Sequence, residues 1–347
     1  MPPNVPFAQP ILLDPLLIDK VWGGDRLTRF GKNVKPGAKV GESWELADLD
    51  STSTSGAGGG AAHSRIASPE IPNAKTLRDL IGLDPNAILG DAAQPKHPQF
   101  PLLVKFLDAA ENLSVQVHPS PTYAESHEEA HLKTECWYIL DAAPGSVIYK
   151  GVKPGVDSVQ FEKAITDGTV VDLMHAEPAI VGHMHNLPSG TVHALGAGVV
   201  VAEVQTPSDT TFRVFDWGRT GRELHIAQAM QCIDFDLAPV ATQWDSPLSD
   251  NGLRKTLVQT EFFIVEEMRL ERNYSCTGAP NAHASGIRPV VIMQLRGSSV
   301  VTGTDRSTEP LHLVTGSTTV VPASASRDCV ITGMSDDCVC LVTTVIG

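Results

Sequence analysis

Short runs of apolar residues that alternate with polar ones recur along the chain. Glycine and proline, with 29 and 25 copies, separate these runs. A period of two with frequent turns is typical of strands. The pattern predicts strands at "SVIYKGV" (146–152), "VVVAEVQ" (199–205), "FFIVEEMRL" (262–270), "PVVIMQL" (289–295) and "DCVCLVTTV" (337–345). Many short strands favour an all-β sandwich or barrel.

Three segments depart from this alternation. The stretch from Thr76 to Pro85 has helical spacing and ends at a proline, so it predicts a short helix. A second short helix is predicted from Thr122 to His131. The segment from Ser51 to Ser64 is rich in Gly, Ser, Ala and Thr, a composition that predicts a mobile surface loop.

A short internal repeat, called the internal echo below, bears on domain organisation. The segments Gly182–His193 and Gly316–Arg327 each place a glycine six positions before a proline, and a strand-like run lies between. This spacing is typical of one edge of a jelly roll, and two copies predict two related barrels. We expect a first domain at residues 1–240 and a degenerate barrel at 241–347, since the linking segment is rich in turn residues. The second copy carries Arg327 where the first carries His193, so if His193 binds a metal, the C-terminal barrel has lost that ligand and is structural.

Composition and charge narrow the class of protein. The net charge of −14 argues against a nucleic-acid partner, because binding to phosphate backbones needs a basic face. There is no apolar run long enough to span a membrane, and the N-terminus lacks the pattern of a signal peptide, so we expect a cytoplasmic protein. The six cysteines form no CxxC pair, which favours free thiols over a disulfide framework.

The polar residues of four separated segments suggest a metal site. Gln116 and His118 lie two residues apart in a strand-like run, so their side chains share one face. Glu135 begins another apolar stretch, and His193 follows a Pro-Gly turn. Two imidazoles, a carboxylate and an amide oxygen suit a catalytic Zn²⁺ better than a closed structural zinc site.

Two other histidine pairs have spacings that would also fit a metal. His183 and His185 have strand spacing, while His127 and His131 have the spacing of one helical turn. A single buried histidine is also more often a hydrogen-bonded core residue than a ligand. Spacing alone therefore does not choose among the three pairs.

Six segments together resemble a known family. They are "VWGGDRL" (21–27), "GESWELAD" (41–48), "FPLLVKFLDAAENLSVQVHPS" (100–120), "KTECWYIL" (133–140), "LPSGTVHALGAG" (187–198) and "EVQTPSDTTFRVFDWGR" (203–219). They are similar to the type I phosphomannose isomerases, the mannose-6-phosphate isomerases of the cupin superfamily, in their shorter bacterial form. The matching blocks run from about residue 10 to 220, and the C-terminal third is similar only as a degenerate β-domain. The first motif reads Gln116-x-His118, where cupins in general have His-x-His, and this is the family's own pattern.

The resemblance implies a fold of two jelly-roll (cupin) barrels with a few short helices and a site for one Zn²⁺ per chain. It implies three groups of site residues. The metal ligands would be Gln116, His118, Glu135 and His193. Near the substrate phosphate would lie Lys105, Ser114 and Arg219. At the reacting carbons would lie Lys133, Asp209 and Arg213.

The activity implied by the resemblance is the interconversion of mannose 6-phosphate and fructose 6-phosphate through an enediolate. Lys133 is a candidate for the base that carries the proton, and Arg213 for the cation that stabilises the enediolate. The expected partner is a phosphorylated hexose. The alternative function is a non-catalytic, metal-binding cupin that senses sugar phosphates. The residues beside the ligands favour the enzyme, because a sensor needs no group for proton transfer.

Overall fold

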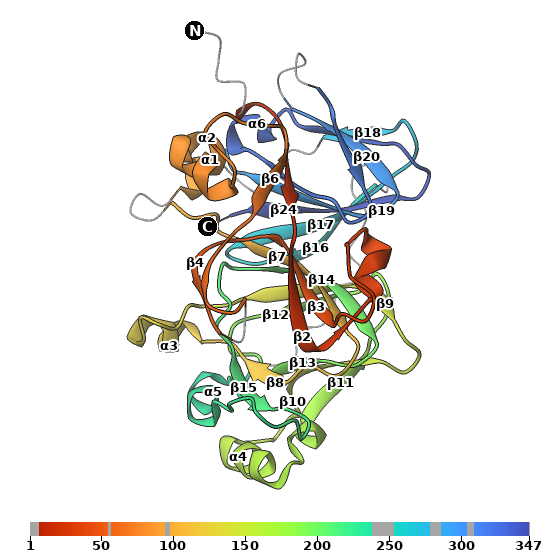
Figure 1. Ribbon diagram of the computed structural model, residues 1–347. Helices are drawn as coiled ribbons and strands as arrows, with labels where there is room; N and C mark the ends of the chain where they lie inside the picture. The colour runs from red at the N-terminus through yellow and green to blue at the C-terminus, as the bar shows by residue number, and fades with distance from the viewer. Residues whose placement is uncertain are drawn as a thin grey trace.

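The computed structural model of the chain describes residues 7–54, 57–93, 98–237, 253–277, 286–303 and 309–346. Antiparallel strands are its main secondary structure and the helices are short, which confirms the predicted all-β fold of two jelly-roll barrels. Figure 1 shows one barrel above the other, with α4 and α5 at the lower end and α1, α2 and α6 near the upper end.

The first barrel consists of two facing sheets. One sheet has six strands in the order β12 (Met184–Leu187), β9 (Glu135–Ala142), β14 (Val199–Gln205), β7 (Leu103–Ala109), β3 (Val40–Leu46) and β2 (Leu16–Gly24). The other has five strands in the order β11 (Met174–Pro178), β10 (Val147–Val152), β13 (His193–Leu195), β8 (Val115–Val117) and β15 (Phe212–Phe215).

The second barrel repeats this arrangement with seven and four strands. The seven-stranded sheet has the order β16 (Arg254–Gln259), β17 (Phe263–Leu270), β24 (Cys338–Val345), β19 (Val290–Arg296), β22 (Thr318–Val321), β1 (Ile11–Asp14) and β6 (Arg65–Ser68). The four-stranded sheet has the order β18 (Ser275–Thr277), β23 (Val330–Gly333), β20 (Ser298–Thr302) and β21 (Leu311–Val314). All five segments that the alternation predicted as strands are strands here.

The four large sheets stack in layers, and alternate residues of each strand enter different cores. Val104 and Phe106 of β7 pack in one cluster with Val291 and Leu341 of the second barrel. Leu107 of the same strand faces the interior of the first barrel. Since successive side chains of a strand point to opposite faces, β7 is buried on both sides. The six-stranded sheet is therefore a shared wall between the interior of the first barrel and the second barrel.

Short helices cover the ends and outer faces of this stack. They are α1 (Leu77–Leu83), α2 (Pro85–Leu89), α3 (Pro121–Ser126), α4 (Ser158–Asp167), α5 (Ile226–Cys232) and α6 (Ala323–Ser326), with 3₁₀ turns η2 (Arg26–Phe30), η3 (Gly90–Ala92) and η4 (Val170–Leu173). The helix expected from Thr76 to Pro85 is α1. Thr76 and Asp79 cap its N-terminus reciprocally, and it ends before Pro85.

The second predicted helix is only half right. Helix α3 ends at Ser126, so His127 and His131 do not share a helical turn. The Ser126 hydroxyl donates hydrogen bonds to the carbonyls of Thr122 and Tyr123, which a continuing helix would use for its own N–H groups.

The prediction of a mobile loop from Ser51 to Ser64 was wrong at both ends of the segment. Strands β4 (Asp48–Thr52) and β5 (Gly60–His63) pair there as a hairpin, with Thr52 opposite Gly60. Positive φ values at Gly58, Gly59 and Gly60 make the turn, a conformation that glycine adopts without steric cost. The glycines therefore serve a turn in the hairpin.

The internal echo has a structural counterpart. Gly182 and Gly316 both have φ of +88°, and each leads into a four-residue strand, β12 and β22, which a proline follows. After Pro322 the chain enters α6, so Arg327 lies at a helix end and not inside a barrel. The domain limits 1–240 and 241–347 stay a prediction, and the segment around the proposed boundary lies largely outside the described residues. The sheet order adds that β1 and β6, from the N-terminal part of the chain, belong to the seven-stranded sheet.

Two further findings concern the chain as a whole. Each helix in the described part of the chain is too short or too polar to cross a bilayer. All six cysteines carry free thiols.

Candidate active site

A row of polar side chains crosses the inner face of the five-stranded sheet. Gln116 of β8 lies directly opposite His193 of β13 on one side and Arg213 of β15 on the other. Val115 and Val117, the neighbours of Gln116, pack outward in the cluster under α4 and α5. Because β-strand side chains alternate, the three polar residues face the barrel interior together.

A second row faces the first from the six-stranded sheet. Trp137, Glu203, Lys105 and Trp44 lie opposite one another on the adjacent strands β9, β14, β7 and β3. Glu135 precedes Trp137 by two residues, so it shares the same face of β9. The barrel interior thus holds charged groups from both sheets.

His118, Glu135 and His193 converge between these two rows. Their ligand atoms lie within 4.8 Å of one another. The Nε2 atom of His118 is 3.3 Å from Oε2 of Glu135, and Nε2 of His193 is 3.2 Å from Oε1. All three side chains are at most 2% exposed. Among the described residues, this is the one group of three or more His, Cys, Asp or Glu side chains with metal-binding spacing.

The hydrogen bonds of the two histidines orient their lone pairs toward the carboxylate. Nδ1 of His118 lies 2.9 Å from the Thr210 carbonyl, and Nδ1 of His193 lies 2.8 Å from the Thr191 carbonyl. A carbonyl only accepts, so in each ring the proton belongs on Nδ1 and a lone pair remains on Nε2. Both oxygens of Glu135 are buried, and each faces one of these Nε2 atoms. Converging lone pairs of this kind fit a bound divalent cation.

Gln116 adds a fourth group to this cluster. Its Nε2 lies 3.3 Å from Nε2 of His193, and the Ser114 hydroxyl donates to its Oε1 over 3.4 Å. Turning the amide over would present Oε1 to the same point. The structure therefore brings all four predicted ligands together, from three strands and the residue after β8.

The ammonium group of Lys133 lies against the cluster. Its Nζ is 2.7 Å from Oε2 of Glu135, 3.1 Å from Nε2 of His118 and 3.7 Å from Oε1 of Glu203. Burial by itself raises the pKa of Glu135, but Lys133 and His118 hold it well below its ordinary value. Burial, together with Lys133, lowers the pKa of His118 to about 3. The carboxylate is thus ionised and this imidazole neutral at pH 7, as metal ligands must be.

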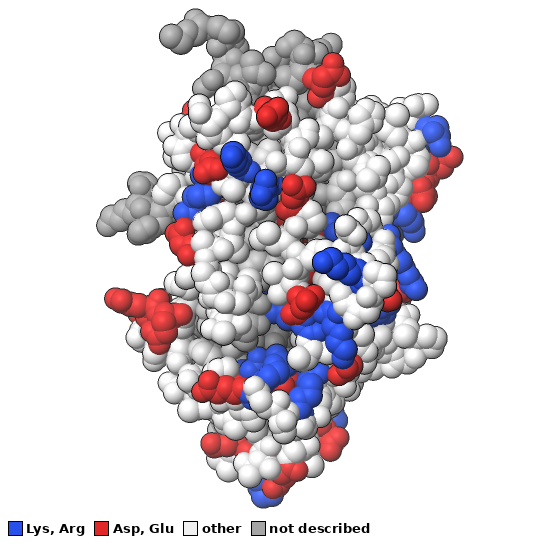
Figure 2. All heavy atoms as spheres, viewed as in Figure 1, with Lys and Arg blue, Asp and Glu red and all other residues white. Residues whose placement is uncertain are grey.

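A pocket of about 70 Å³ opens beside the cluster. Figure 2 shows basic side chains gathered over β2, β8 and β15, where this face of the molecule is hollowed. Six of the predicted site residues line the pocket, together with two tryptophans: Lys105, Ser114, Gln116, Lys133, Asp209, Arg213, Trp22 and Trp44.

Four further charged residues line the pocket and were not predicted as site residues: Lys20, Glu42, Glu203 and Arg222. Glu203 interrupts the run of valines in β14, and a charged residue inside such a strand is the signal that could have identified it. Glu42 sits within the block "GESWELAD" beside Trp44.

Lys105 is held between two of these carboxylates. Its Nζ is 3.5 Å from Glu203 and 3.6 Å from Glu42. Burial lowers the pKa of Lys105, but Glu203 and Glu42 together raise it above its ordinary value. Burial also raises the pKa of Glu42, yet the cations Lys20 and Lys105 bring it down to about 2. Glu203 lies between Lys105 and Lys133, so Lys105 is close to the metal cluster as well.

Arg213 and Asp209 both reach the pocket without pairing with each other. Arg213 donates from Nη1 to the Glu223 carbonyl over 2.6 Å, and its buried Nε has no hydrogen-bond partner. Asp209 accepts hydrogen bonds from the backbone N–H of Ser53 at 2.7 Å and from its hydroxyl at 3.0 Å. The β4–β5 hairpin therefore holds Asp209.

Arg219 is not among the residues that line the pocket. It donates from Nη2 to Asp216 at 2.7 Å and to the Asn112 carbonyl at 2.8 Å. Arg222 binds the same Asp216 carboxylate at 2.9 Å and lines the pocket. Asp216 therefore couples the predicted arginine to one that the sequence analysis did not single out.

The two alternative histidine pairs lie outside the metal cluster. His183 and His185 adjoin β12, where His185 is buried and faces Glu177 at 3.5 Å. His127 stacks on Tyr123 at 3.9 Å. The tertiary structure thus brings together only the set that includes His118 and His193.

Known proteins match the chain over both barrels. The family described as phosphomannose isomerase type I, catalytic domain, matches residues 12–147. The probable mannose-6-phosphate isomerase GmuF of Bacillus subtilis is 38% identical over 234 residues, which are 65% of this chain and 69% of that protein. The mannose-6-phosphate isomerase ManA of Bacillus subtilis is 31% identical over 277 residues, 77% of this chain and 82% of that protein. The crystal structure of the Bacillus subtilis mannose 6-phosphate isomerase has a TM-score of 0.80 at 29% identity, covering 96% of this chain and 99% of that one.

Proposed function

The chain belongs to the type I phosphomannose isomerase family, and we propose that its pocket interconverts mannose 6-phosphate and fructose 6-phosphate. The observation that carries this proposal is the convergence of His118, Glu135 and His193 beside Lys133 and Arg213. The two sugars differ in the position of a carbonyl and of one proton, so the reaction needs a base and charge stabilisation but no redox cofactor.

The proposed cofactor is one Zn²⁺ per chain, held by His118, Glu135, His193 and Gln116. The set of nitrogen and oxygen donors, with both imidazole protons engaged by backbone carbonyls, supports a catalytic zinc more than a closed thiolate site. When bound, Zn²⁺ supplies Lewis-acid stabilisation of negative charge that develops on the sugar oxygens.

Lys133 is the proposed base. In its neutral amine form, Nζ would accept the proton from C2 of the open-chain aldose and return it to C1 of the enediolate, while the hydroxyl proton passes from O2 to O1, which yields the ketose. The position supports this role, since Nζ is next to the ligand Glu135 and faces the pocket. Glu203, 3.7 Å from Nζ, balances the charge of Lys133 after proton uptake.

Arg213 and Asp209 are proposed to act on the same intermediate. The guanidinium of Arg213 is fixed by the Glu223 carbonyl and keeps a buried Nε without a partner, which suits a cation aimed at enediolate oxygens. Asp209 lines the same pocket and orients a sugar hydroxyl. Its own position is set by the hydrogen bonds from Ser53.

The phosphate end of the substrate needs fixed cations and hydroxyl donors. Lys105, Ser114 and Arg219 are the proposed group, and Arg222 joins them because it lines the pocket while sharing Asp216 with Arg219. Phosphate binding positions C1 and C2 at the reacting groups.

The test is a coupled assay of mannose 6-phosphate isomerisation before and after removal of metal by chelation. We expect turnover that chelation abolishes and Zn²⁺ restores. Activity that survives exhaustive chelation would exclude the metal from the mechanism. Bound metal without turnover of any phosphorylated hexose would instead favour the sugar-phosphate sensor, and turnover of another phosphorylated sugar alone would reassign the substrate.

A further inference from the structure

A groove of about 660 Å³ lies between the two barrels, apart from the substrate pocket. Phe30, Leu140 and Val181 of the first barrel and Leu295 and Val339 of the second form its apolar walls. A volume of this size at a domain junction, with apolar walls and a few polar groups, is typical of sites for small molecules. The groove shares no lining residue with the substrate pocket.

Three arginines from separate parts of the chain line this groove: Arg29, Arg269 and Arg296. Their side chains are 64%, 61% and 63% exposed. They come from η2, β17 and β19. Each guanidinium group lies beside one carboxylate, from Asp141, Glu267 and Asp337 respectively, and Asp337 also lines the groove.

Each of these arginines is held from one side. Arg29 donates from Nη1 to Asp141 at 2.8 Å, Arg269 donates from Nε to Glu267, and Arg296 donates from Nε to the Asp337 carbonyl at 3.2 Å. A guanidinium has five N–H donors, so these contacts orient the groups and leave further donors for a ligand. Guanidinium groups fixed in this way bind phosphate, sulfonate or carboxylate groups with two parallel hydrogen bonds.

Tyr138 connects the groove to the strand that carries a metal ligand. Its hydroxyl donates to Glu267, the carboxylate that also holds Arg269. Burial and Glu267 raise the pKa of Tyr138, so the hydroxyl stays protonated, while Arg269 and Arg296 act in the opposite direction. Tyr138 and Leu140 face the groove from β9, and Glu135 and Trp137 face the metal cluster from the same strand.

We propose that this inter-barrel groove binds an organic anion that combines a phosphate, sulfonate or carboxylate group with an apolar ring. The anionic group contacts Arg29, Arg269 and Arg296. The ring packs on Leu140, Val181 and Val339. A ligand there lies against the side of β9 opposite Glu135, outside the pocket that takes the substrate.

The probe for the test is anilinonaphthalene sulfonate, an apolar-ringed anion whose fluorescence rises in an apolar site. The full chain is titrated in the presence of saturating mannose 6-phosphate, so that the substrate pocket is occupied. Val181 is 58% exposed, so its substitution should leave the fold intact. Val181→Asp places a negative charge in the groove, and Val181→Lys places a positive one at the same position.

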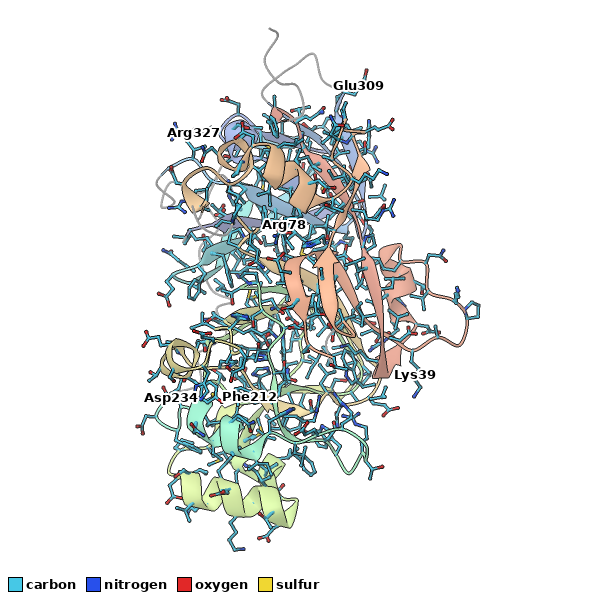
Figure 3. All side chains as sticks on the ribbon, turned by 60° about the vertical axis from the view of Figure 1, so that its left-hand side comes forward. Lys39, Arg78, Phe212, Asp234, Glu309 and Arg327 are labelled. Carbon is cyan, nitrogen blue, oxygen red and sulfur yellow. The ribbon has the colours of Figure 1, made fainter. Side chains whose placement is uncertain are left out.

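We expect one saturable site. Val181→Asp should weaken binding about fivefold or more, while Val181→Lys should leave it equal or tighter. Arg296→Ala should also weaken binding. Arg327→Ala is the matched control, because this exposed arginine does not line the groove. It lies at the end of α6, near the upper end of the molecule in Figure 3. Inorganic sulfate should compete only weakly, since it lacks the ring.

Equal affinity of the Val181→Asp and Val181→Lys variants for the probe would overturn the proposal. Complete displacement of the probe by mannose 6-phosphate would also overturn it, because that result would place the probe in the substrate pocket. The Val181 pair decides the question even if mannose 6-phosphate is not the substrate.

Discussion

At the scale of single residues, backbone carbonyls prepare the metal cluster. Thr210 and Thr191 fix the tautomers of His118 and His193, so that both Nε2 lone pairs face Glu135. Holding these lone pairs close to the carboxylate costs free energy, and this cost is offset when a cation binds. This cluster is therefore expected to contribute to metal affinity more than to the stability of the fold.

His193→Ala should lose zinc and activity together and keep the fold, because catalytic metals need not hold a structure together. Metal analysis of the purified variant, with circular dichroism for the fold, provides the measurement. His183→Ala is the control from the histidine pair outside the cluster and should retain one zinc per chain. Stoichiometric zinc in His193→Ala would remove this residue from the ligand set.

Arg222→Ala should raise the KM for mannose 6-phosphate about tenfold or more and leave the zinc content unchanged, since one charge-assisted contact with phosphate is worth about 1.5–3 kcal/mol. Arg219→Ala should raise KM less, because Arg219 does not line the pocket and contacts Arg222 only through Asp216. Steady-state kinetics separates the two. An unchanged KM in Arg222→Ala would exclude it from the phosphate end.

At the scale of elements, strand register builds the site. Gln116, His193 and Arg213 belong to three strands, and they share a row because β8, β13 and β15 pair at those residues. A slip of one residue in β8 would send Gln116 into the apolar cluster under α4 and α5. The β4–β5 hairpin contributes in a different way, by reaching Asp209 from outside the barrel.

Ser53→Ala should lower kcat about fivefold, because it removes one of the two hydrogen bonds to Asp209, a loss of about 1 kcal/mol. Zinc content and the KM should change little. Ser51→Ala, an exposed position in the same hairpin, is the matched control and should behave as the wild type. If both variants keep full kcat, the hairpin does not position Asp209 for the reaction.

At the scale of the whole molecule, the second barrel supports the wall on which the pocket is built. Ser43 and Glu45 of β3 face the second barrel, while Glu42 and Trp44 face the pocket. Glu45 accepts from Thr318 at 3.2 Å and pairs with Lys32 at 2.7 Å. The same strand therefore carries a buried polar junction on one side and the pocket on the other.

Lys32→Met should destabilise the protein by about 3–5 kcal/mol at pH 7, because it leaves Glu45 buried without its cation. Burial raises the pKa of Glu45, and without Lys32 the group must take up a proton to stay buried. Because the pKa of Glu45 is raised in the folded variant, the variant loses stability as pH rises. Its free energy of unfolding should therefore lie further below that of the wild type at pH 8 than at pH 5.

The measurement is the midpoint of urea unfolding for both proteins at the two pH values. Lys39→Met is the control, since the Lys39–Glu111 pair is more than half exposed and Lys39 lies at the surface in Figure 3. An exposed pair contributes less than about 1 kcal/mol. Equal effects of the two substitutions would show that the junction does not stabilise the packing of the barrels.

The sequence by itself determined the features that depend on neighbouring residues. Alternation located the strands, helical spacing that ends at Pro85 located α1, and the spacing of Gln116 and His118 placed both on one face. The resemblance to a family then named the remaining ligands. The strand inferences succeeded because side-chain direction in a strand repeats every two residues, whatever the strand pairs with.

Only the tertiary structure decided which distant residues share the pocket. Glu203 and Arg222 entered it through cross-strand register and through Asp216, and the glycine-rich segment became a hairpin because its strands pair with each other and hold Asp209. The N-terminal strand β1 belongs to the C-terminal sheet because it pairs with β22. Pairing between strands far apart in the chain depends on the packing of whole sheets, which no local pattern of residues encodes.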